Sequence, residues 1–135
     1  MKVKFIVDEK KLERNKPVLF YNADYSDLTF NKEYVVMAIT KWDNVLYFYV
    51  LGDESIKYPL PFPIQIFEVI DSRFSEYWNY SKNNFSESLN ISEHEVISFN
   101  EWSVGKDFFY EKILDEDSET LLIFIKYRDL MINEF

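Results

Sequence analysis

The sequence of 135 residues contains no cysteine, only two glycines and a single histidine. Without cysteine there are no disulfides, no thiolate metal sites and no cysteine nucleophile. Two glycines are too few for a glycine-rich phosphate loop or for the tight turn around a nucleophilic serine. One histidine argues against most His-based catalysis and against His-rich metal sites. These scarcities favour a non-enzymatic protein, and we expect neither a cofactor nor a metal.

Basic residues are also scarce, because 15 Lys and Arg stand against 24 Asp and Glu, a net charge of −9. Such a balance disfavours nucleic acid as a partner, since phosphate contacts need clustered cations. The acidity is uneven: residues 1–41 carry a net charge of +2, whereas residues 42–135 carry −11. We therefore expect the later part of the chain to bind a basic protein partner.

Long hydrophobic runs are missing as well. The longest, Val45 to Leu51 and Leu121 to Ile125, are far shorter than the roughly 20 residues of a membrane-spanning helix. The segment from Met1 to Arg14 has only a short apolar patch, which does not resemble a signal peptide. A cytoplasmic protein with no membrane partner is the resulting expectation.

Aromatic residues are abundant, with 13 Phe, 10 Tyr and 3 Trp. They provide enough apolar surface for one core, so we expect a single domain over residues 1–135. Within it we predict a β core over residues 17–80, a loop or linker over the Ser- and Asn-rich residues 81–90, and a mainly helical part over residues 91–135. The predicted fold class is α+β.

The strongest β signal is a hairpin of residues 34–40 and 45–51 around the turn formers at 41–44. Residues 58–63 carry three prolines at alternate positions, which predicts an extended edge segment with Leu60 and Phe62 packed on the sheet, in preference to a proline-rich ligand. Further strands are predicted at residues 1–7, 17–21, 56–58 and 64–70, and residues 96–99 would form either one more strand or an extended tether.

Three helices are expected. The first covers residues 72–80 and would bury Phe74, Tyr77 and Trp78 at helical spacing. The second covers residues 106–114. The third begins at Asp117 or Ser118, although residues 120–132 would also suit a strand. As a helix it would turn one apolar face inward, made of Leu121, Phe124, Ile125, Met131, Ile132 and Phe135.

Two polar clusters invite a chemical interpretation. His94 lies between Glu93 and Glu95, but neighbouring side chains rarely face one another, so we interpret it as solvated in an acidic loop. The acidic run from Asp115 to Glu119 opens like a calcium loop, yet Thr120 replaces the glycine that such a loop requires at its sixth position. A helix start or a partner-binding acidic patch explains the run better.

The candidate partner-binding residues combine the aromatic hairpin with nearby acids, because tyrosine and tryptophan are enriched at protein interfaces. The alternative is that helices cover the sheet and bury these aromatic rings. The candidates are Trp42, Asp43, Tyr47, Tyr49, Asp53, Glu54, Asp115, Glu116, Asp117 and Glu119.

Residues 28–36, with Leu-Thr-Phe-Asn-Lys-Glu-Tyr-Val-Val, are followed by the hairpin, by Tyr58-Pro59 and by Ile-Phe-Glu-Val-Ile-Asp at 66–71. This pattern resembles small bacterial and phage proteins with an SH3-like barrel, some of which are immunity proteins of polymorphic toxin systems. The resemblance covers residues 17–78. Asn31 stands where the family prefers glycine, and asparagine also tolerates a left-handed turn.

The resemblance implies a bent, partly open SH3-like antiparallel sheet, on which a short helix and a C-terminal helical element pack. With the acidic charge it leads to our main hypothesis, an immunity protein that neutralises a basic toxin. One alternative is an adaptor or phage-derived structural protein that binds peptides or self-associates through its sheet edge. Another is a hydrolase that uses carboxylates alone.

Overall fold

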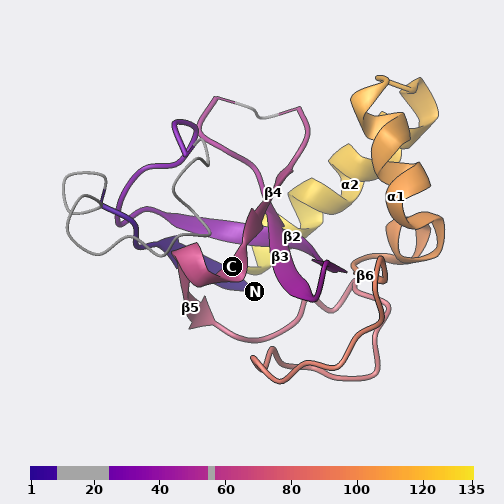
Figure 1. Ribbon diagram of the computed structural model, residues 1–135. Helices are drawn as coiled ribbons and strands as arrows, with labels where there is room; N and C mark the ends of the chain where they lie inside the picture. The colour runs from indigo at the N-terminus through magenta and orange to yellow at the C-terminus, as the bar shows by residue number, and fades with distance from the viewer. Residues whose placement is uncertain (9–24, 55–56) are drawn as a thin grey trace.

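The computed structural model describes residues 1–8, 25–54 and 57–135, and in them an antiparallel sheet of six strands meets two α-helices (Figure 1). The α+β prediction is thereby confirmed. The strands are β1 (Lys2–Phe5), β2 (Glu33–Trp42), β3 (Val45–Val50), β4 (Leu60–Pro63), β5 (Phe67–Asp71) and β6 (Val96–Ile97). The helices are α1 (Asn100–Leu114) and α2 (Ser118–Glu134), and a 3-10 turn, η2 (Ile64–Ile66), precedes β5.

The strand order is β4-β3-β2-β1-β5, and β6 adds to β2. The long strand β2 changes partner along its length: residues 33–35 pair with β1, whereas Ile39 and Thr40 pair with β6. A register shift between Val36 and Ala38 in the pairing with β3 lies where this change occurs, as expected for a bulge that bends a strand. The sheet is not closed, and among the described residues β4 and β5 lie at the two ends of this strand order.

The β2–β3 hairpin confirms the strongest strand prediction. Its turn residues Asp43 and Asn44 have φ values of 48° and 65°, the left-handed pair that a two-residue hairpin turn requires. Asn31, with a φ of 66°, adopts the left-handed conformation expected there. Asparagine and aspartate tolerate this backbone region better than other residues with side chains, so local sequence determines both turns.

The proline-rich segment forms the edge strand β4, as expected, and Phe62 is buried against the sheet. The other strand predictions near it fare less well. Residues 57–58 form a bend instead of a strand, and residues 17–21 and 56 lie outside the described residues. The strand expected at 64–70 begins only at Phe67, because residues 64–66 form η2.

The helix predicted over residues 72–80 is wrong. This segment pairs with residues further along the chain: the Phe74 N–H donates to the Asn83 carbonyl oxygen at 2.7 Å, and the Phe85 N–H to that of Ser72 at 2.8 Å. Trp78 is nevertheless buried, and its indole N–H donates to the sulfur of Met131 at 3.1 Å. Long-range pairing satisfies the backbone here in place of helical hydrogen bonds.

The helix predicted over residues 106–114 is the second half of α1, which begins earlier, at Asn100. The two halves meet at a kink, because Lys106 has a φ of 51° and a ψ of −132°. Gly105 lies beside the kink, where an added Cβ would stand 2.8 Å from the Cβ of Phe109. A close approach between turns of α1 thus explains one of the two glycines.

The segment after Asp117 is a helix, which settles the choice between helix and strand. The Asp117 carboxylate accepts the Thr120 N–H at 3.1 Å, as the predicted cap requires. The predicted inward face is only partly right: Phe124 and Met131 are buried, but Ile125 and Ile132 are exposed. The helix α2 packs on β2 and on α1, which in turn packs on β6 (Figure 1).

Candidate functional site

One face of the aromatic strand β3 packs against α1 through Tyr49. Tyr49 is only 1% exposed, and its ring centroid lies 4.9 Å from those of Trp102 and Tyr110. Burial raises the pKa of Tyr49 and raises that of Tyr110 to about 12. Tyr49 therefore belongs to the core, as the alternative interpretation of the aromatic residues expected, and does not reach a partner surface.

Trp42 and Tyr47 lie at the end of the same hairpin and are half-buried, with ring centroids 5.0 Å apart. The turn between them is held by Glu93, whose carboxylate accepts the N–H groups of Asp43 and Asn44 at 2.9 and 2.7 Å. This contact fixes the acidic loop around residue 93 against the hairpin. Of the hairpin candidates, Asp43 alone is fully exposed.

The single histidine, His94, is exposed and lies beside α1. Its backbone N–H donates to the Lys41 carbonyl oxygen at 2.8 Å, and its exposed Nδ1 lies 3.4 Å from an Asp107 carboxylate oxygen. In the described residues, no group of three His, Asp or Glu side chains is arranged to hold a metal ion. The interpretation of His94 as a solvated residue of an acidic loop fits this placement.

Asp53 and Glu54 follow β3, and much of their bonding capacity is used within the chain. The Asp53 carboxylate binds the Lys32 ammonium group and accepts the hydroxyl of Thr29 at 2.6 Å and that of Tyr34 at 3.1 Å. Although partial burial opposes the effect, these hydrogen bonds hold the pKa of Asp53 below its usual value. Asp53 thus closes a loop, whereas the Glu54 side chain is exposed.

The acidic run from Asp115 to Glu119 forms the connection between α1 and the start of α2, and each of its acidic side chains is exposed. Hydrogen bonds from the Thr120 hydroxyl and N–H lower the pKa of Asp117, which caps the helix. A Glu116 carboxylate oxygen lies 3.9 Å from the Lys57 ammonium nitrogen. The run therefore begins a helix and also presents charge to solvent.

Sequence reasoning missed an exposed apolar face on α2. Leu122, Ile125 and Ile132 are 69%, 37% and 44% exposed, and their spacing of three and seven residues places them on one side of a helix. We call these three residues the α2 patch. A signal for this face was present in the sequence, because apolar residues occur on two sides of α2. A helix that packs against the core on one side needs apolar residues on that side only.

A groove of about 440 Å³ adjoins the α2 patch. Its apolar wall comes from Tyr58, Ile113, Leu121 and Ile125, and its charged residues are Lys57, Glu116 and Arg128. Residues 100–135, which form both helices, include nine acidic and four basic residues, a net charge of −5. The exposed apolar side chains thus lie on the acidic helical part of the chain.

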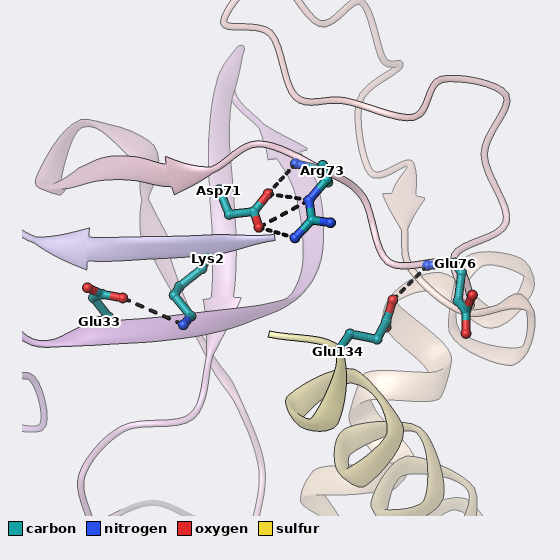
Figure 2. A network of polar contacts seen from close by, with 6 residues as sticks. All are labelled: Lys2, Glu33, Asp71, Arg73, Glu76 and Glu134. Atoms are coloured by element: carbon teal, nitrogen blue, oxygen red, sulfur yellow. Dashed lines mark hydrogen bonds and ion pairs between the residues drawn. The ribbon is translucent and has the colours of Figure 1, made fainter.

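Polar contacts hold the C-terminal end of α2 against residues 75–76, in the segment that follows β5 (Figure 2). The Glu134 carboxylate accepts the Glu76 N–H at 3.0 Å and the Ser75 hydroxyl. Beside it, the Arg73 guanidinium binds Asp71 at 2.6 Å and holds the pKa of that carboxyl at about 2. The C-terminal end of α2 is thus tied to the segment that follows β5.

Comparison of the chain with protein-family models, with curated proteins and with solved structures found no match. In residues 1–8, 25–54 and 57–135, neither α1 nor α2 carries an apolar stretch that would span a bilayer. We therefore infer function from the surfaces described above.

Proposed function

We propose that this chain is a non-enzymatic binding protein that neutralises a basic protein, such as a toxin, through the α2 patch and the acids around it. The observation that carries the proposal is the exposure of Leu122 and Ile125 on a helix that otherwise packs well. Exposed apolar groups within a charged surrounding are typical of protein interfaces.

The charge distribution identifies the kind of partner. The connection between the helices brings four acids, Asp115, Glu116, Asp117 and Glu119, to the N-terminal end of the α2 patch. Acidic residues around an apolar centre accelerate association with a basic surface, while the apolar side chains supply most of the affinity.

The toxin-immunity role rests on the resemblance of residues 17–78 to SH3-like immunity proteins. The strand order supports the SH3-like part of the proposal, because β5 follows a 3-10 turn and lies beside β1 in an antiparallel sheet that is not closed. The fold by itself does not determine the activity, so the partner surface on α2 carries the functional argument.

The test is co-expression with the basic protein encoded beside this chain's gene, measured as growth rescue and as a complex on size-exclusion chromatography. We expect rescue and a 1:1 complex by the wild-type chain. Leu122→Gln and Ile125→Gln should each weaken the complex by about tenfold or more, as truncated interface anchors do.

The matched control is Val104→Gln, because Val104 on α1 is 70% exposed, almost the same as Leu122. We expect this variant to bind like the wild type. If the wild-type chain gives neither complex nor rescue, the proposal is wrong. If Val104→Gln weakens the complex as much as Leu122→Gln does, the α2 patch is not the binding surface.

A further inference from the structure

The strands β4 and β5, at the two ends of the strand order, differ in their ability to accept another strand. The edge strand β4 contains Pro61 and Pro63, which lack the N–H group that an added strand would need. Prolines are a common protection of an edge against pairing with another chain. The other edge strand, β5, has no proline between Phe67 and Asp71, and among the described residues it forms the end of the strand order.

Hydrogen-bond directions show which groups of β5 face the open edge. Just after β1, the Ile6 N–H donates to the Ile66 carbonyl oxygen, on the side of β5. The Phe5 N–H donates to the Lys32 carbonyl oxygen, on the side of β2, and both distances are 3.0 Å. Because such bonds alternate along an antiparallel pair, Val69, opposite Val3, is at a position without hydrogen bonds to β1. Its N–H and C=O groups therefore point toward the open edge.

Just after β5, the chain already pairs with a later segment of itself. Residues 72–74 form a short ladder with residues 83–85, centred on the bridge between Arg73 and Asn84. At Ser86 the chain turns, as the Leu89 N–H donates to the Ser86 carbonyl oxygen at 2.8 Å. Residues 83–85, which pair with residues 72–74, thus end where the unpaired edge of β5 begins among the described residues.

A cavity of about 560 Å³ lies at this place. Its apolar wall includes Phe48, Phe67 and Phe85, and two exposed carboxylates, Glu68 and Glu87, also line it. No lysine or arginine is found among its lining residues in the described part of the chain. An apolar side chain next to a cation would satisfy both features.

We propose that the open edge of β5 binds an extended basic peptide, which adds as an antiparallel strand in line with residues 83–85. The peptide exchanges backbone hydrogen bonds with Val69, places an apolar side chain in the cavity, and directs lysine or arginine toward Glu68 and Glu87. A second copy of this chain is a poor occupant, because its net charge of −9 is repelled. The site goes beyond the proposed function, since it lies on the sheet and not on α2.

The probe is a fluorescent peptide of alternating valine and lysine, compared with its valine–glutamate counterpart. We expect the basic peptide to bind, the acidic peptide to fail, and the Val69 amide to gain protection from hydrogen exchange in the complex. The chain should remain monomeric by analytical ultracentrifugation. Anisotropy titration measures the affinity, and no toxin is needed, so this test is independent of the one for α2.

Two variants separate the backbone contact from the charge contact. Val69→Pro removes the outward N–H together with the valine side chain, and should weaken the basic peptide about three- to tenfold, the effect of one lost hydrogen bond. Glu68→Lys combined with Glu87→Lys should weaken binding of the basic peptide about tenfold or more. The loss of affinity should be larger at low salt, where charges are screened less. The control is Glu54→Lys, a single reversal of the same kind at an exposed site after β3, which should leave the affinity unchanged.

The proposal is overturned if the basic peptide does not bind, or if the acidic peptide binds equally well. It is also overturned if protection appears on α2 in place of Val69, or if Glu54→Lys weakens the peptide as much as the paired reversal does. Circular dichroism and the β1 amide signals check that Val69→Pro keeps its fold. If that variant unfolds, the paired charge reversal and the Val69 protection decide the matter.

Discussion

The strand β3 and the helix α2 are both rich in apolar residues, yet β3 buries most of its apolar side chains whereas α2 leaves several exposed. β3 lies between two layers, since Tyr49 packs on Trp102 of α1 and Phe48 packs on Phe67 and Phe85. α2 belongs to the outer layer and buries only one side. Coverage by neighbouring elements, and not the number of aromatic residues, decides whether an apolar face becomes core or stays exposed.

The largest expected effect contrasts the two faces directly. Trp102→Ala removes a fully buried ring and should lower the free energy of unfolding by about 3–5 kcal/mol. Leu122→Ala removes an exposed side chain and should change it by no more than about 0.5 kcal/mol. Urea unfolding followed by circular dichroism measures both. Similar losses for the two variants would show that α2 is covered on its outer side.

A second test uses pH to probe the covered face. Burial raises the pKa of Tyr110 from 10 to about 12, so the neutral phenol is favoured in the folded state. The neutral Tyr110 phenol contributes its full share to the free energy of unfolding below pH 10, the ordinary pKa of tyrosine. This contribution is lost as pH rises from 10 toward 12. We expect the urea midpoint to fall over this range, and Tyr110→Phe to flatten the decline. An equally steep decline in that variant would assign the effect elsewhere.

The smallest effect concerns how α2 begins. Asp117→Ala removes the carboxylate that accepts the Thr120 N–H and should cost about 1 kcal/mol of unfolding free energy. Asp115→Ala, an exposed acid two residues earlier, should change it by less than about 0.5 kcal/mol. Thermal or urea unfolding distinguishes the two variants. Equal losses would mean that general acidity, and not capping, supports the helix.

Local signals account for the parts of the fold that the sequence predicts. The β2–β3 hairpin follows from alternating apolar residues and from turn residues that accept a positive φ, and α2 follows from the Asp117 cap. Residues 72–80 could not be predicted in this way. Their aromatic residues do have helical spacing, but pairing of residues 72–74 with residues 83–85 stabilises an extended conformation instead of a helix.

The candidate site was predictable only in its acidic part. The residues from Asp115 to Glu119 were identified by charge alone, and they are exposed. The α2 patch was not identified, because both sides of α2 are apolar in sequence and only packing determines which side is buried. The kink at Lys106 likewise hid the first half of α1, since a positive φ at lysine has no sequence signature.

The contact of Trp78 with Met131, together with that of Ser75 with Glu134, bears on the timing of folding. Residues 131–134 are synthesised after every strand of the sheet, yet they satisfy polar groups beside β5. β5 in turn pairs with β1, which was made more than sixty residues earlier. Contacts of such long sequence separation slow folding and expose unfinished chains to aggregation. A chain that ends before Met131 would therefore lack the contacts that hold residues 75–78 beside the end of β5.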